Sequence, residues 1–173
     1  MRKKIVCMGS VNMDLCMHMQ IMPNVGETIR TDNFATYPGG KAGNQAAAAG
    51  ELGGNVCVLA RLGDDAFSTQ LTDELKRHGV QTNSLIYEQN ATAGIAMIRI
   101  DAQGRNSISF TPGANAAISP QLSPPMPSNT ANAGILLPET ISEYTPSAPW
   151  FSAGSDFPQH QKLSSLFVLT FPV

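Results

Sequence analysis

The sequence has little net charge, few cysteines and no long apolar run. Among its 173 residues, 11 Lys and Arg face 13 Asp and Glu, which gives a formal net charge of −2 with histidine neutral. This balance lacks the basic excess that holds a phosphate backbone, so we expect no nucleic-acid partner. The three cysteines are odd in number and form no CxxC pair, which excludes a closed disulfide framework and favours reduced thiols in the cytoplasm.

Apolar segments are also too short for a membrane helix or a signal peptide. The apolar run that follows Lys4 is interrupted by Gly9 and Ser10, too early for the core of a signal peptide. No window approaches the roughly 18 apolar residues that a membrane helix needs. Apolar types still make up 42% of the chain, which is enough for a buried core. The sequence therefore predicts a cytoplasmic globular protein without a membrane partner.

Up to about residue 122, short apolar runs alternate with amphipathic segments. Runs that stop at glycine are typical of buried strands, and the four-residue spacing of Phe67, Leu71 and Leu75 is typical of a helix. Strands alternating with helices predict an α/β fold, and two strands around a polar turn predict a second, smaller sheet. The predicted strands cover residues 5–8, 15–21, 56–60, 95–100 and 106–110, and the predicted helices cover 44–52 and 66–78.

The chain changes character after residue 122. Residues 123–173 hold 8 of the 12 prolines but only four charged residues. No helical period survives this proline density, and the apolar stretch at 166–171 has no evident partner. We therefore divide the chain into a patterned domain over 1–122 and a proline-rich, irregular tail over 123–173 that is unrelated to it.

Two groups of side chains favour a structural over a metal-binding interpretation. His18 lies beside sulfur ligands of the kind that Cu(I) accepts, but strand alternation would bury Met17 and Met19 and place His18 on the opposite face. Asp64 and Asp65 precede a predicted helix, so helix capping explains them. The sequence therefore predicts no metal site.

Two glycine-rich clusters, Gly9–Asp14 and Pro38–Ala46, carry the candidate chemistry. In the first, Asn12 and Asp14 are two residues apart, so an extended backbone sends both side chains to one side. An amide and a carboxylate together suit neutral polyol hydroxyls, because the amide donates and accepts and the carboxylate accepts. Each cluster alone would fit an ordinary capped turn or helix start equally well.

In their order and spacing, the two clusters resemble the ribokinase-like (PfkB) family of carbohydrate kinases. The resemblance covers roughly residues 4–122 and implies the N-terminal part of a three-layer α/β/α fold with a small β lid. Further matching segments are Gly26–Thr28, Gly63–Asp65, Thr92–Ala96 and Pro112–Ala116.

The resemblance also implies a sugar-binding half-site. Asn12 and Asp14 would bond to sugar hydroxyls, and three residues at the helix start would line the same pocket: Gly40, Lys41 and Asn44. Ala96, Ile98 and Phe110 would lie on lid strands that close over the sugar and pair between subunits of a homodimer. Phe110 stands where the family often has a smaller aliphatic residue, and Ala42-Gly43 reverses the commoner order, so the sugar stays open.

The family transfers phosphate from MgATP to a hydroxymethyl group of a pentose such as ribose. Its catalytic aspartate and ATP site, with a monovalent cation in some members, lie later in the family chain than the matched residues. The segment Ser152–Asp156 looks like a degraded copy of the catalytic motif, but it comes too early and Pro158 follows. We therefore expect a truncated or frame-shifted, inactive chain without a catalytic residue. The alternative is a non-catalytic sugar-binding or interaction module.

Overall fold

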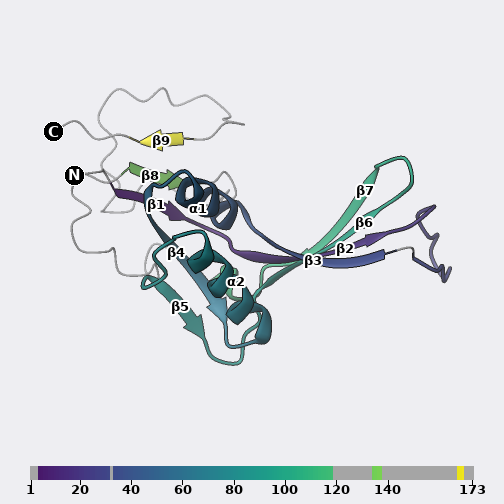
Figure 1. The fold of residues 1–173 in the computed structure, drawn as a ribbon. Helices are drawn as coiled ribbons and strands as arrows, with labels where there is room; N and C mark the ends of the chain where they lie inside the picture. The colour runs from purple at the N-terminus through teal and green to yellow at the C-terminus, as the bar shows by residue number, and fades with distance from the viewer. Residues whose placement is uncertain (1–3, 32, 119–133, 138–166, 170–173) are drawn as a thin grey trace, which may run out of the picture.

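The computed structural model describes residues 4–31, 33–118, 134–137 and 167–169, and these residues form two sheets (Figure 1). The larger sheet has the strand order β5-β4-β1-β8-β9, and the smaller sheet has the order β3-β2-β6-β7. The smaller sheet reaches away from the helices (Figure 1), and we call it the lid. The α/β fold with a second, smaller sheet is thereby confirmed.

The larger sheet is built mainly from parallel strands. Strand β1 lies between β4 and β8 and is parallel to both, β5 is parallel to β4, and β9 is antiparallel to β8. The strands span Lys4–Met8 (β1), Asn55–Gly63 (β4), Leu85–Glu88 (β5), Gly134–Leu137 (β8) and Phe167–Leu169 (β9).

Two α-helices, α1 at Lys41–Glu51 and α2 at Ala66–Arg77, pack on one face of this sheet. Their apolar side chains join those of β1 and β4 in one buried cluster that includes Ala46, Leu62 and Leu71. The alternate residues of β1 and β4 point to the other face, where Val6, Met8, Cys57 and Leu59 form a second buried cluster with Ile118. Neither helix, of 11 and 12 residues, is long enough to span a membrane, and the described residues contain no other α-helix.

The helix ends follow from local sequence signals. Asp65 caps α2, because its Oδ1 accepts a hydrogen bond from Ser68 N at 2.9 Å, as the capping interpretation predicts. Asp64 instead accepts a bond from Asn90 N at 3.1 Å. After the C-cap His78, Gly79 takes a φ of +74°, a value that favours glycine and turns the chain out of the helix.

The lid is a mixed four-stranded sheet. Strand β2 lies between β3, to which it is antiparallel, and β6, to which it is parallel, and β6 and β7 form an antiparallel hairpin. The strands span Asn12–His18 (β2), Asn33–Gly39 (β3), Gly94–Ile100 (β6) and Asn106–Thr111 (β7). A short 3₁₀ helix at Gly113–Ala117 (η1) follows β7 and returns the chain to the larger sheet.

The end of β2 and its pattern of buried residues differ from the sequence-based prediction. The alternation predicts a strand over residues 15–21, but β2 ends at His18, so Ile21 is 59% exposed. The prediction that Met17 and Met19 are both buried is wrong for Met17, which is half-buried, and correct for Met19. Met13 and Cys16 are also buried, so the burial in β2 does not follow a strict alternation. His18 is exposed, and no group of three potential metal ligands comes together in the described part of the chain.

The prediction of an irregular tail is wrong at two short segments. Strand β8 pairs with β1 through Ile5↔Gly134, Val6↔Ile135 and Cys7↔Leu136, and β9 pairs with β8. An exposed strand edge offers backbone donors and acceptors to any apolar segment that reaches it, and proline spacing in the tail cannot reveal such a long-range partner. The rest of 123–173, including the Ser152–Asp156 segment, lies outside the described residues.

Candidate functional site

A cavity of about 680 Å³ lies where the larger sheet meets the lid. The first residues after β1, the start of β2, the start of α1, the hairpin β6–β7 and the η1 segment all contribute to its wall. All eight residues predicted from the sequence line it. The full lining is Gly9, Ser10, Asn12, Asp14, Gly40, Lys41, Asn44, Ala96, Ile98, Ile108, Phe110, Pro112, Asn115 and Ile118.

Strand β2 supplies the polar pair of the cavity. Asn12 and Asp14 lie two residues apart in an extended strand and both line the cavity. The backbone of β3 runs close beside them: a Cβ added at Gly39 would lie 2.8 Å from Asp14 Cγ, so a side chain at position 39 would displace the Asp14 carboxyl group. Burial raises the pKa of the Asp14 carboxyl above its usual value. A half-buried carboxylate has lost part of its hydration, and donors on a ligand can replace that loss.

The start of α1 supplies Lys41 and Asn44, whose side chains are exposed at the cavity. Gly40 precedes them with a φ of +86°, and a Cβ there would lie 2.6 Å from Ser10 O, so only glycine permits this approach. The Ala42 and Gly43 N–H groups donate to the same Ser10 O, at 3.1 and 3.3 Å. Because these helix amides are already bonded, the cavity offers side chains rather than a bare helix N-terminus.

The lid supplies the apolar wall. Ala96 and Ile98 come from β6, and Ile108 and Phe110 come from the antiparallel neighbour β7, with Ala96 paired to Phe110. Ile108 and Phe110 are 56% and 64% exposed, which is unusual for large apolar side chains. A polar floor beneath an apolar wall suits a ligand with hydroxyl groups on its edges and C–H groups on its face.

Six lining residues are absent from the sequence-based set: Gly9, Ser10, Ile108, Pro112, Asn115 and Ile118. Asn115 lies within the family-like segment Pro112–Ala116, so its sequence signal was present without a role attached to it. Its Nδ2 donates to Asn12 Oδ1 at 3.0 Å. Ile108 is two residues before Phe110 on the same strand, so the period of two could have found it.

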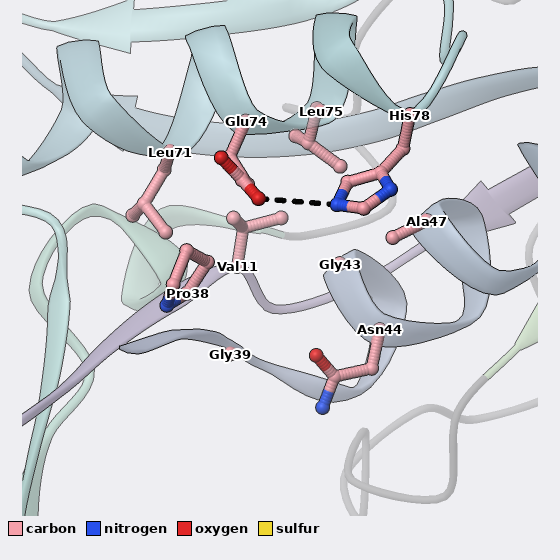
Figure 2. A pocket seen from close by; sticks show the side chains of 10 residues that line it. All are labelled: Val11, Pro38, Gly39, Gly43, Asn44, Ala47, Leu71, Glu74, Leu75 and His78. Carbon is pink, nitrogen blue, oxygen red and sulfur yellow. Dashed lines mark hydrogen bonds and ion pairs between the residues drawn. The ribbon is translucent and has the colours of Figure 1, made fainter. Parts of the chain in front are cut away.

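A second, smaller cavity of about 150 Å³ lies on the other side of α1, between α1, α2 and the end of β3 (Figure 2). Two of its polar lining residues bond to each other, with His78 Nε2 3.1 Å from Glu74 Oε1. His78 Nδ1 also lies 2.6 Å from Oε1 of Glu51, which is outside the lining. The bond to Glu51 and then that to Glu74 raise the pKa of His78, against the opposing effect of burial. Figure 2 shows the Asn44 side chain directed away from this pair. The contacts join the ends of the two helices, which is a structural role.

Within residues 4–31, 33–118, 134–137 and 167–169, no three His, Cys, Asp or Glu side chains come together as they would to hold a metal ion. The first-turn amides of Ala42 and Gly43 are bonded to Ser10 O.

Comparisons with known proteins agree with this arrangement. The model of the pfkB family carbohydrate kinases matches residues 2–147. Ribokinase of Bacillus subtilis is 39% identical over 118 residues, which are 68% of this chain and 40% of the relative. A deoxyribokinase of Salmonella typhi is 35% identical over 117 residues, again 68% of this chain and 38% of the relative.

Solved structures show the same fold. The structure of Arabidopsis thaliana ribokinase complexed with ribose and ATP matches with a TM-score of 0.62 and 32% identity, covering 66% of this chain and 38% of that chain. This chain thus spans about two fifths of the length of the relatives that it matches. The family match over most of the chain, the identities and the shared fold lead to one conclusion: the chain belongs to the pfkB family of carbohydrate kinases.

Proposed function

We propose that residues 4–118 form the sugar-binding part and lid of a ribokinase-like kinase, and that the cavity takes a pentose such as ribose. The observation that carries this proposal is the gathering of Asn12, Asp14, Lys41 and Asn44 beneath an apolar lid wall in one cavity of about 680 Å³. The Arabidopsis thaliana relative was solved with ribose and ATP, and another relative is a deoxyribokinase, which supports a pentose.

Each polar group has a chemical role in this proposal. The Asp14 carboxylate accepts hydrogen bonds from sugar hydroxyls, which offsets the loss of hydration that raises its pKa. Lys41 donates from its ammonium group, and the Asn44 amide both donates and accepts. Ala96, Ile98 and Phe110 cover the C–H face of the ring and limit the access of water.

Phosphoryl transfer is proposed for the whole kinase rather than for these 173 residues alone. Solved ribokinases hold ATP or ADP, and the family resemblance implies that the catalytic aspartate and the ATP site lie later in the family chain than the residues matched here. We therefore propose that this chain by itself binds a pentose without phosphorylating it, as a non-catalytic sugar-binding module. Its cytoplasmic location and the lack of nucleic-acid and membrane partners stay predictions.

Isothermal titration calorimetry tests the proposal. Ribose, 2-deoxyribose and a hexose are titrated into the purified chain with and without MgATP, and ADP release is measured in parallel. We expect 1:1 pentose binding that MgATP leaves unchanged, with no ADP release.

Asp14→Asn should weaken pentose binding about tenfold or more, because it removes a charged acceptor. Asp73→Asn is the matched control, since Asp73 is exposed on α2, away from the cavity, and pairs with Lys76 at 3.3 Å. Absence of pentose binding, or sugar-dependent ADP release, would contradict the proposal.

The lid is also proposed as a homodimer surface. Phe34 and Met97 are 55% and 47% exposed on the face of the lid that is turned away from the cavity, whereas the exposed Tyr37, Ile108 and Phe110 lie on the cavity face. An apolar sheet of this kind is usually covered by another surface, and a second copy offers the same one. Analytical ultracentrifugation should show a dimer that Met97→Lys weakens, while Lys76→Glu on α2 leaves it intact. A monomer at all concentrations would contradict this part of the proposal.

A further inference from the structure

We propose that Asn115 is a positioning residue that fixes the orientation of the Asn12 amide at the cavity. The inference rests on the proposed function, in which Asn12 contacts a sugar hydroxyl. Asn115 belongs to η1, which follows the lid strand β7, whereas Asn12 opens β2, so residues 103 positions apart meet at the root of the lid.

The orientation of the Asn115 amide is set by backbone groups. Its Oδ1 accepts from Val11 N at 3.1 Å, and its Nδ2 donates to Val11 O at 3.3 Å and to Pro112 O at 2.9 Å. A backbone N–H can only donate and a carbonyl can only accept. If the Asn115 amide were turned over, its NH₂ group would face the Val11 N–H and its oxygen would face the carbonyl oxygens of Val11 and Pro112. Only the observed orientation therefore satisfies these three backbone groups.

This orientation determines which atom Asn12 presents to a ligand. The two hydrogens of Asn115 Nδ2 serve its two shortest contacts, Pro112 O at 2.9 Å and Asn12 Oδ1 at 3.0 Å, and the longer contact with Val11 O at 3.3 Å shares one of them. The oxygen of Asn12 is therefore turned toward Asn115. The NH₂ group of Asn12 is then left for the cavity that this residue lines. Asn12 consequently acts as a donor, whereas the Asp14 carboxylate acts as an acceptor. A pair of neighbouring hydroxyls fits these two groups when one accepts from Asn12 and the other donates to Asp14.

Glycines at positions 94 and 113 let the backbone approach the Asn12–Asn115 contact closely. Gly94 pairs with Asn12 in the lid, and a Cβ at Gly94 would overlap both Asn115 Nδ2 and Asn12 Oδ1. Gly113 takes a φ of +52°, and Ala114 N donates to Thr92 O at 2.9 Å, which holds η1 against the segment before β6. The Asn12–Asn115 contact therefore depends on glycine at position 94 and on a fixed position of η1.

The test is the isosteric variant Asn115→Asp in the full chain, with ribose as the ligand. The new carboxylate still accepts from Val11 N but has no NH₂ group, so Asn12 should turn its own NH₂ toward it. We expect at least a tenfold loss of ribose affinity by calorimetry. In ¹⁵N-labelled protein, the side-chain amide signals of Asn12 should move in the sugar-free state and should stop responding to ribose. Assignment comes from the signals that disappear in Asn12→Ser.

Two further variants keep the test decisive. Asn115→Ala adds no charge but also frees the Asn12 amide, so it should weaken ribose binding and change the Asn12 signals even if Asn115→Asp does not fold. Asn106→Asp is the control, because Asn106 is exposed in the lid and lies outside the cavity lining. It should leave affinity and Asn12 signals unchanged.

The outcomes separate this inference from the proposed function. Unchanged Asn12 signals and unchanged ribose affinity in Asn115→Asp and Asn115→Ala would overturn the inference alone. If the wild-type chain binds no pentose while its Asn12 signals still depend on Asn115, the proposed function fails and the positioning contact is supported.

Discussion

The larger sheet and the lid use similar strands but bury them very differently. In β4, eight consecutive residues from Val56 to Gly63 are buried, whereas in β7 five of six residues are exposed. The apolar side chains of β7 therefore contribute little to the core, whereas β2 contributes Met13 to it. The difference indicates that the larger sheet stabilises the molecule, and that the lid keeps apolar surface available for a ligand or a second copy.

The largest expected difference between the larger sheet and the lid is in the free energy of unfolding that is lost when equal apolar volume is removed from each. Leu62, in β4, is fully buried, and Ile108, in β7, is 56% exposed. Leu62→Ala should lower the free energy of unfolding by about 2–5 kcal/mol, because it leaves a cavity, and Ile108→Ala should lower it by less than about 1 kcal/mol. Urea denaturation followed by circular dichroism measures both, and equal losses would contradict the division of roles.

A smaller effect is expected where the two regions join. Gly40 and Gly104 have φ values of +86° and +75°, but a Cβ at Gly40 would meet Ser10 O at 2.6 Å, whereas a Cβ at Gly104 would meet nothing within 4 Å. Gly104→Ala should cost about 1 kcal/mol from its backbone conformation alone. Gly40→Ala should cost about 3 kcal/mol and should also disturb the cavity. The same denaturation series checks this, and similar costs would show that the close approach at Gly40 is unimportant.

The smallest expected change in the free energy of unfolding concerns Asp65, which connects α2 to Ala93, the residue before β6 of the lid. Its carboxylate accepts from Ser68 N at 2.9 Å and from Ala93 N at 3.3 Å. Burial alone would raise the pKa of Asp65, but the hydrogen bonds from Ser68 and Ala93 outweigh burial and lower it. A lowered folded-state pKa gives stability that is present above the unfolded value of about 3.9 and is lost as the pH falls through the folded value.

Asp65→Ala should therefore lower the free energy of unfolding by about 1 kcal/mol at pH 7, as the loss of a helix cap does. The difference from the wild type should shrink as the pH falls below about 4. Thermal or urea unfolding at several pH values measures it. A difference that stays constant with pH would show that the charge of Asp65 plays no part.

Local patterns predicted the core elements but not the strands that depend on remote partners. The four-residue spacing of Phe67, Leu71 and Leu75 located α2 to within a residue. Strand β3 contains Pro38 and Gly39 and β5 has only four residues, so neither has a local strand pattern, and both exist because a neighbouring strand offers backbone partners.

The candidate site shows the same limit. The i, i+2 spacing of Asn12 and Asp14 and the two glycines at 39 and 40 were visible in the sequence, because these signals are local. The role of Asn115 was not visible, since its contact with Asn12 spans 103 positions and depends on how the lid returns to the larger sheet.

The most direct test of the sugar-binding proposal is a ribose titration of the ¹⁵N-labelled chain followed by backbone amide signals. The account predicts saturable shifts at Asn12, Asp14, Gly40 and Ala96, which line the cavity, and unchanged signals at the exposed residues of α2 such as Asp73. Shifts confined to other parts of the chain, or no shifts at all, would contradict the assignment of this cavity to a pentose.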